Sequence, residues 1–261
     1  MDQLLSLLGG PVRPFERSWR LALGGLILSL GLWGTGYGPW VAGLVLLVLG
    51  LDFVWGVWDP KRGYFVETLN RLEPRGKELY LTFDDGPNGE ETTQVLGLLE
   101  QYGAKASFFV VGQKVKDQPE LVRAMVQGGH EVGNHSWSHS GWINFSNAPG
   151  WQREIAPTNQ LLESLGVVPR YFRPPVGLTN PHLGAALEAT GMTALGWSFR
   201  TQDWRETNLE KLVERILARV EPGAVFLLHD GPHPGVAASK VLAVLLPRLL
   251  AQGYFLTPLP H

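Results

Sequence analysis

The chain has 261 residues, a formal net charge of -2 at pH 7, and no cysteine. Because the charge is nearly balanced and no lysine- or arginine-rich run occurs, the composition argues against a nucleic-acid-binding protein. The absence of cysteine excludes a disulfide framework, a thiolate nucleophile and a cysteine zinc site. This length suffices for one large domain or two ordinary ones.

Residues 21–58 form an apolar stretch in which Asp52 is the single charged side chain. One straight helix over this stretch would be about 57 Å long, nearly twice the ~30 Å hydrocarbon core of a bilayer. The glycine-rich sequence GTGYGP at 34–39 divides the stretch. We therefore expect an N-terminal membrane region, 1–58, with a transmembrane helical hairpin whose spans cover about 19–37 and 40–58. Its expected partner is the lipid bilayer.

One tilted span with an interfacial segment is the alternative, because the first span is rich in glycine and Asp52 weakens the second. A signal peptide fits less well, since the apolar run is too long and no A-x-A-like cleavage site follows it. Arginines precede the stretch, and arginines and lysines follow it. A hairpin places both flanks on one side, so the positive-inside bias predicts an integral membrane protein whose remaining chain faces the cytoplasm. A single span would reverse this sidedness.

Short β-rich runs alternate with helical patterns from residue 78 onward, after a predicted linker at 59–77. This alternation predicts a parallel sheet with crossover helices, either a barrel or a doubly wound sheet. In both arrangements functional groups gather at the carboxyl ends of the strands. Strands are predicted at 78–83, 106–112, 130–135, 170–174, 193–199, 224–229 and 254–259, and helices near 91–102, 118–128, 151–165, 181–190, 208–220 and 237–251.

Polar side chains follow several of the predicted strands. Taken singly, each group has an ordinary structural explanation: adjacent aspartates at a strand end, for example, favour the first turn of the next helix. Their joint occurrence at strand ends that share one edge of a sheet indicates a common site instead. The groups are Asp84 and Asp85, His135 and His139, Arg173, Asp203 with Trp204, and His229.

These residue types suit hydrolysis assisted by a metal ion. Two imidazoles and one carboxylate make a three-ligand site that keeps open positions for water and substrate. One aspartate of the Asp84–Asp85 pair can ligate the metal, and the other can accept the proton of water. His229 can protonate a leaving group when a carboxylate such as Asp203 orients it. The G-x-S-x-G and phosphate-loop motifs are missing from the sequence, which argues against a serine hydrolase and a nucleotide-binding protein.

The motifs resemble those of the NodB-homology polysaccharide deacetylases, carbohydrate esterase family 4. The resemblance covers residues 78–261, and the motifs stand in family order: TFDDGP at 82–87, HSWSH at 135–139, RPPVG at 173–177, DW at 203–204 and LLHD at 227–230. It implies an α/β catalytic domain at 78–261 with a distorted (β/α)7-type barrel, the NodB-homology fold. It also implies one divalent metal ion, zinc in the first place, with cobalt, nickel or manganese as alternatives.

The resemblance implies a role for each matching residue. Asp84 would be the general base and Arg173 its brace, while His229 would be the general acid and Asp203 the group that orients it. The implied metal ligands are Asp85, His135 and His139. The implied substrate-binding residues are Val176 through its backbone N–H, Trp204 as a groove wall, and Leu227 against the acetyl methyl group.

Two positions depart from the family pattern. Val176 replaces the tyrosine that commonly follows R-P-P, which keeps the backbone N–H but removes a ring that could contact sugar. Arg200 stands three residues before Asp203, where the family often has an acidic residue. We expect this second substitution to alter the substrate groove and not the chemistry.

The expected function is metal-dependent hydrolysis of N-acetyl groups from an N-acetylated carbohydrate: a GlcNAc-containing polysaccharide, peptidoglycan or a lipid-linked glycan. An O-acetyl esterase of the xylan type would use the same site. A catalytically silent sugar-binding protein is the third interpretation, and the presence of every expected catalytic group argues against it. The predicted membrane region favours a lipid-linked or wall-proximal sugar over a free soluble polymer.

Overall fold

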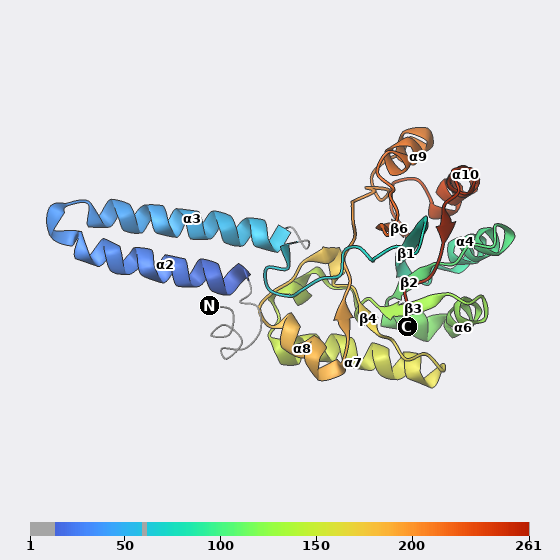
Figure 1. The fold of residues 1–261 in the computed structure, drawn as a ribbon. Helices are drawn as coiled ribbons and strands as arrows, with labels where there is room; N and C mark the ends of the chain where they lie inside the picture. The colour runs from blue at the N-terminus through green and yellow to red at the C-terminus, as the bar shows by residue number, and fades with distance from the viewer. Residues whose placement is uncertain (1–13, 59–61, 261) are drawn as a thin grey trace.

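The structure is a computed structural model that describes residues 14–58 and 62–260. Residues 1–13 of the predicted membrane region, residues 59–61 of the predicted linker, and residue 261 lie outside the described residues. Figure 1 shows a pair of helices near the N-terminus that projects from a larger body of strands and helices.

The projecting pair consists of α2 (Pro14–Gly31) and α3 (Gly38–Trp58), joined by the short 3-10 helix η2 (Trp33–Thr35). The two helices lie side by side and run in opposite directions (Figure 1). Gly36 follows η2 with a φ of 81°, a left-handed conformation that glycine adopts without steric cost. The turn therefore reverses the chain tightly between two apolar helices.

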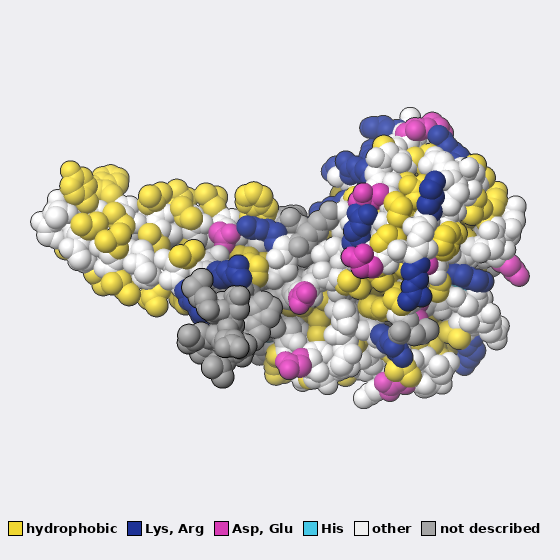
Figure 2. All heavy atoms as spheres, viewed as in Figure 1, with side chains coloured by type: hydrophobic (Ala, Val, Ile, Leu, Met, Phe, Trp, Pro, Cys, Tyr) yellow, Lys and Arg dark blue, Asp and Glu magenta, His cyan; other side chains and the backbone are white. Residues whose placement is uncertain are grey.

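Of the described helices, only α3 is long and apolar enough to cross a membrane, over Gly38–Val57. Figure 2 shows hydrophobic side chains exposed along the helix pair, and Trp40 is 80% exposed. The predicted first span, 19–37, differs from α2, which begins at Pro14 and ends at Gly31. The helix stops before the glycine-rich sequence and not within it, so the apolar stretch does not divide into two equal helices.

The larger body is built on a seven-stranded sheet of parallel pairs in the order β5-β4-β3-β2-β1-β6, with β7 paired to β1. The predicted strands are all present, and the parallel α/β class is confirmed. The sheet forms a half-barrel, and a single bridge from Phe199 to Phe226 connects the segment after β5 to β6. The strands are β1 (Glu78–Gly86), β2 (Ser107–Val110), β3 (Glu131–Asn134), β4 (Tyr171–Phe172), β5 (Thr193–Ala194), β6 (Val225–His229) and β7 (Phe255–Leu256).

Helices cover the outer face of this sheet (Figure 1). Asparagine side chains cap two of them: Asn147 Oδ1 accepts from the Gly150 N–H, and Asn208 Oδ1 accepts from the Lys211 N–H. The helices are α4 (Gly89–Gln101), α5 (Gly112–Asp117), α6 (Pro119–Gln127), α7 (Ala148–Ser164), α8 (Leu183–Thr190), α9 (Leu209–Leu217) and α10 (Ala238–Ala251), with 3-10 helices η4 (Gly141–Phe145) and η5 (Pro175–Gly177).

Side chains of β1 alternate between the two faces of the sheet, as a strand period of two requires. Leu81 and Phe83 belong to the large apolar core under the helices, whereas Tyr80 belongs to a smaller cluster on the inner face. Thr82 and Asp84 continue the inner set and are buried. The strand therefore directs a carboxylate into the half-barrel at its carboxyl end.

The central part of the predicted linker, 59–77, packs into the folded body and is not a spacer. Tyr64, Phe65 and Val66 are buried in an apolar cluster with residues of α7 and α8. Farther along, Leu69 forms a parallel bridge with Leu195, and Arg71 an antiparallel bridge with Ala224. The folded body therefore begins before residue 78. The sequence concealed this because charged and polar residues interrupt the short apolar group.

Asp52, the charged residue of the apolar stretch, lies where the helix pair meets the folded body. Its Oδ2 accepts hydrogen bonds from Ser18 Oγ at 2.6 Å and from Tyr64 Oη at 2.7 Å. Arg62 Nη1 lies 3.3 Å from Asp52 Oδ1. These contacts join α2, α3 and the segment after α3, which compensates for a carboxylate in an apolar helix.

Replacing Phe65 by alanine tests whether this segment belongs to the core. Phe65 is 2% exposed, so we expect the free energy of unfolding to fall by about 3–5 kcal/mol. Phe145→Ala is the matched control, because Phe145 is 82% exposed and its loss should change stability by less than about 0.5 kcal/mol. Denaturant unfolding in detergent, monitored by tryptophan fluorescence, measures the free energy of unfolding of both variants. Equally small changes in the two variants would mean that the segment is a spacer.

Candidate active site

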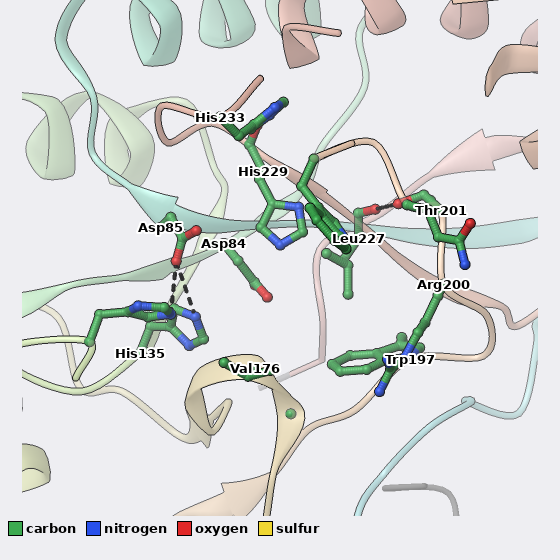
Figure 3. A pocket seen from close by; sticks show the side chains of 14 residues that line it. Asp84, Asp85, His135, Val176, Trp197, Arg200, Thr201, Leu227, His229 and His233 are labelled. Carbon is green, nitrogen blue, oxygen red and sulfur yellow. Dashed lines mark hydrogen bonds and ion pairs between the residues drawn. The ribbon is translucent and has the colours of Figure 1, made fainter. Parts of the chain in front are cut away.

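A pocket of about 470 Å³ lies where the carboxyl ends of the strands meet the loops that follow them. Figure 3 shows the side chains that line it, and several of them belong to the sequence motifs at the ends of the strands. The pocket collects most of the predicted site residues, while Arg173 and Asp203 lie buried behind it. Its lining residues are Asp84, Asp85, His135, His139, Val176, Gly177, Trp197, Arg200, Thr201, Gln202, Trp204, Leu227, His229 and His233.

Asp84 and His229 are register partners on the adjacent parallel strands β1 and β6. Arg173, which follows β4, reaches across the inner face of the sheet, and its Nη1 donates to Asp84 Oδ1 at 2.5 Å. Asp84 is 4% exposed and Arg173 is fully buried. An ion pair with so little solvent around it fixes the position of the carboxylate.

The buried guanidinium of Arg173 has several partners besides Asp84. Its Nη1 also donates to Thr82 Oγ1 at 2.8 Å, and its Nη2 donates to the Gly196 carbonyl oxygen at 2.8 Å. Its Cζ lies 4.2 Å from the centre of the Phe109 ring. These contacts offset part of the cost of burying the charge.

Asp85 occupies an irregular position of β1, where the register with β2 shifts between Asp84 and Gly86. Its φ of 72° places the backbone in the left-handed region, so its carboxylate turns toward His135, as Figure 3 shows. The two aspartates therefore diverge because of this bulge, and not because of the pleat of a regular strand.

Asp85, His135 and His139 form a cluster that could hold a metal ion. Asp85 Oδ1 lies 3.5 Å from His135 Nε2 and 3.1 Å from His139 Nε2, and one ligand atom from each residue lies within 4.8 Å of the others. Asp85 Oδ1 is buried and has no hydrogen-bond partner in the described part of the chain. A buried oxygen without a donor beside two imidazoles fits a bound cation.

The protonation of this cluster agrees with that fit. His135 Nδ1 lies 2.7 Å from the Arg173 carbonyl oxygen, which can only accept, so Nδ1 carries the proton and Nε2 is available as a ligand. Burial and the neighbouring His135 lower the pKa of His139, which favours its neutral form. Burial alone would raise the pKa of Asp85, but contact with His135 and the charges of both histidines hold it well below its usual range.

His229 and Asp203 form a second coupled pair on the other side of Asp84. Asp203 Oδ2 accepts from the His229 N–H at 2.7 Å, and Asp203 Oδ1 lies 3.0 Å from His229 Nδ1. Burial alone would lower the pKa of His229, but the hydrogen bond and charge of Asp203 raise it to about 9. The imidazole therefore holds a proton at neutral pH, with Nε2 pointing into the pocket.

Backbone strain concentrates at this site. The non-glycine residues with positive φ in the described part of the chain are Asp85, Ser136, His139, Val176 and Gln202. Four of them line the pocket, and Ser136 follows the lining residue His135. A left-handed conformation costs about 1–3 kcal/mol per residue and persists only where surrounding contacts impose it. Val176 has this conformation although it is β-branched, and it lines the pocket.

The predicted substrate-binding residues also line the pocket. Val176 is 56% exposed and Trp204 is 48% exposed, so both offer surface to a ligand. Leu227 is 5% exposed and forms part of the apolar floor. The structure thus brings the residues of the five sequence motifs to one place.

The sequence patterns do not predict several other residues of the site. Trp197, Gln202 and His233 line the pocket but belong to no motif. Glu154 of α7 lies outside the pocket, and its Oε2 accepts from the Trp137 N–H at 3.1 Å and the Ser138 N–H at 2.8 Å. It therefore secures the loop between the two cluster histidines. An acidic residue inside an amphipathic helix carries no signal for such a role.

Glu154→Ala should weaken metal binding by about 10–100-fold, because the loop that positions His139 loses its acceptor. Glu163→Ala is the matched control, since Glu163 is an exposed carboxylate on the same helix. Competition with a fluorescent zinc chelator measures both affinities. Equal zinc affinity in the two variants would contradict the assignment of Glu154 as a positioning residue.

Comparisons with known proteins agree with this geometry. A family model described as "Polysaccharide deacetylase" matches residues 71–195. The chain is 35% identical to a chitooligosaccharide deacetylase of Bradyrhizobium sp. (strain ANU 289), over 71% of this chain and 90% of that protein. It is also 35% identical to a peptidoglycan-N-acetylglucosamine deacetylase of Bacillus cereus, over 70% of this chain and 91% of that protein.

A solved structure extends the similarity to three dimensions. The family 4 acetyl xylan esterase from Clostridium thermocellum, in complex with a cobalt ion, has a TM-score of 0.63 and 36% identity, over 70% of this chain and 88% of that chain. The region that the family model matches contains the Asp85, His135 and His139 cluster together with Asp84 and Arg173. Because the similarity covers nine tenths of two relatives, the chain belongs to the polysaccharide deacetylase family.

Proposed function

We propose that the protein hydrolyses N-acetyl groups of a GlcNAc-containing glycan. The observation that carries this proposal is the placement of the Asp84–Arg173 and His229–Asp203 pairs beside the cluster of Asp85, His135 and His139. A proton acceptor, a proton donor and a cation site then share one pocket. The similarity to a chitooligosaccharide deacetylase and a peptidoglycan-N-acetylglucosamine deacetylase supports the choice of substrate.

Asp85, His135 and His139 would hold one divalent metal ion, and their mixed oxygen and nitrogen donors suit zinc or cobalt. When bound, such an ion supplies Lewis-acid polarisation of the acyl oxygen and lowers the pKa of a coordinated water. The family 4 esterase solved with cobalt supports a divalent ion here. We propose zinc first, with cobalt, nickel or manganese as alternatives.

The remaining residues would divide the proton transfers between them. Asp84, held in place by Arg173, accepts a proton from the attacking water as the water oxygen bonds to the acetyl carbon. The backbone N–H of Val176 donates to the oxyanion that develops on the acyl oxygen. His229, held by Asp203, then donates a proton to the amine nitrogen as the C–N bond breaks. Acetate and the free amino sugar are the products.

An O-acetyl esterase is the second candidate, supported by the 36% identity to an acetyl xylan esterase. The same residues would act, with an alcohol in place of the amine as leaving group. Acetate release from tetra-N-acetylchitotetraose and from acetylated xylan, measured side by side with zinc-loaded protein, separates the two candidates. Asp85→Ala controls for contaminating activity. Release from xylan alone would overturn the N-deacetylase proposal, and release from neither, with metal bound, would favour a silent sugar-binding protein.

We propose further that the N-terminal region anchors the protein in a bilayer through the pair α2 and α3. The apolar helix over Gly38–Val57 supports one span, and the adjacent α2 makes a second, shorter passage compatible with a hairpin. By flanking charge the folded body would face the cytoplasm. Because the chain has no cysteine, a single Thr35→Cys variant labelled from either side of the membrane tests this arrangement.

Asp84→Asn should lower the rate of acetate release by at least about 100-fold, because the amide cannot accept the proton of water. The residue lies outside the Asp85, His135 and His139 cluster, so we expect zinc content to stay the same. Turnover on chitotetraose and metal analysis of the same samples measure both quantities. Wild-type turnover in this variant would refute Asp84 as the general base.

The rate of acetate release should depend on the proton of His229. Because the pKa of His229 is raised to about 9, the donor is present at neutral pH and is lost as pH rises through that value. Asp203→Asn removes the hydrogen bond and charge that raise this pKa, so the alkaline limb of the pH–rate profile should move to lower pH. Profiles of kcat/KM for the two proteins decide this, and coincident alkaline limbs would exclude His229 as the acid.

A further inference from the structure

We propose that Lys114 is a positioning residue for the candidate metal ligand Asp85, and that it raises the affinity of the site for a divalent ion without contacting that ion. The inference rests on the metal site of the proposed function and deepens it. Lys114 lies on α5, the short helix after β2, and is not among the described residues that line the pocket. It belongs to none of the five sequence motifs.

The backbone of Asp85 is held in a conformation that an aspartate does not favour. Its φ of 72° lies in the left-handed region, and the register of β1 with β2 shifts between Asp84 and Gly86. Asp85 has no register partner on β2 or β6 among the described strand pairs. A strained residue persists only where surrounding contacts impose its conformation. Contacts outside the regular strand pairing must therefore hold the carboxylate of Asp85 in place.

Lys114 supplies a contact of this kind. Its Nζ donates to the backbone carbonyl oxygen of Asp85 at 2.5 Å, and its side chain is partly buried. A hydrogen bond from an ammonium group is stronger than one between neutral groups. Because the direction of the carbonyl defines ψ of Asp85, this bond restrains the strained residue from which the carboxylate projects. Lys114 thus acts on the metal ligand through the main chain.

Helix α5 also holds the loop that carries the two cluster histidines. The Gly112 N–H donates to the Ser136 carbonyl oxygen at 2.9 Å. The Gln113 N–H donates to the Trp137 carbonyl oxygen at 3.0 Å. Both acceptors lie between the two histidines in the sequence. One short helix therefore contacts both parts of the candidate metal cluster, the histidine loop through its first N–H groups and the aspartate through Lys114.

The segment after β6 also borders Asp85. A Cβ atom added at Gly231 would lie 2.6 Å from Asp85 Cβ, so only a glycine lets this segment approach so closely. The same added atom would lie 3.5 Å from Lys114 Nζ. Gly231 and Lys114 therefore border Asp85 together, and the ammonium group supplies the directional bond.

The positive charge of Lys114 by itself would weaken metal binding. Like charges repel, and the repulsion is greater in a partly buried site than in water. Burial and the neighbouring His135 lower the pKa of His139 most, and the charge of Lys114 adds to that lowering, so the ammonium acts on the cluster. If electrostatics alone mattered, removing this charge would tighten zinc binding. Loss of the hydrogen bond to Asp85 would weaken it, so the two effects have opposite signs.

The test measures the zinc affinity of the full chain in detergent by competition with a fluorescent chelator. Lys114→Met removes the ammonium group and keeps an unbranched apolar side chain, whereas Lys114→Arg keeps a cationic donor. Lys116→Met is the matched control, since Lys116 is an exposed lysine on the same helix and its loss changes the net charge equally.

We expect zinc to bind Lys114→Met about tenfold more weakly than the wild type, as is typical when a group that supports a metal ligand is lost. Lys114→Arg should restore most of this affinity, and Lys116→Met should keep the wild-type value. Thermal unfolding of the metal-free proteins reports on folding. If Lys114→Met does not fold, Lys114→Gln takes its place, because the shorter amide also removes the charge.

The absorption spectra of the cobalt-loaded proteins give a second readout, because the bands of cobalt depend on the type and geometry of its ligands. Displacement of Asp85 should change these bands in Lys114→Met and leave them unchanged in Lys116→Met. A general loss of stability would not alter the spectrum of the bound ion.

Zinc affinity in Lys114→Met that equals or exceeds that of Lys116→Met, or identical cobalt spectra, would overturn this role of Lys114 and leave the proposed metal site in place. Absence of zinc binding by the wild type would overturn both. Acetate release from tetra-N-acetylchitotetraose, measured on the same samples, judges the proposed deacetylation separately. A zinc-loaded wild type that releases no acetate would refute that function and not the role of Lys114.

Discussion

The burial of Arg173 is the constraint on which the site depends. A guanidinium that is fully buried costs several kcal/mol unless its donors are satisfied, so the surrounding strands must present acceptors at fixed positions. Asp84 of β1 and the Gly196 carbonyl after β5 accept from its two terminal nitrogens, whereas its Nε has no hydrogen-bond partner among the described residues. The backbone carbonyl oxygen of Arg173 orients His135. The side chain and backbone of Arg173 thus connect Asp84 with His135, a candidate metal ligand, and with the segment that follows β5.

Much of the site could be predicted from the sequence because its residues follow strands. Alternation of strands and helices implies a parallel sheet, and a parallel sheet brings its carboxyl ends to one edge. That argument alone groups Asp84, Asp85, His135 and His139 without any knowledge of distances. The seven-stranded sheet supports it, with β1 and β6 pairing Asp84 with His229 in register.

Other features depend on local geometry that no periodic pattern encodes. The bulge that turns Asp85 toward the histidines requires a left-handed backbone at an ordinary aspartate. The places of Trp197 and Glu154 in the site depend on tertiary contacts. In the sequence, Trp197 resembles a core aromatic residue and Glu154 resembles a solvent-exposed charge on a helix. The helix α2 ends at Gly31, whereas hydrophobicity alone places the boundary near the longer glycine-rich run. Hydropathy measures solvent preference, and helix termination depends on backbone conformation.

The pairing of Leu69 with Leu195 and of Arg71 with Ala224 also bears on how such a protein can evolve. Here the segment that leaves the helix pair supplies side chains to the core and backbone partners to the sheet. A gene fusion joined at residue 78 would therefore separate the catalytic fold from part of its own interior. Any successful exchange of the helix pair has to leave residues 64–72 with the folded body.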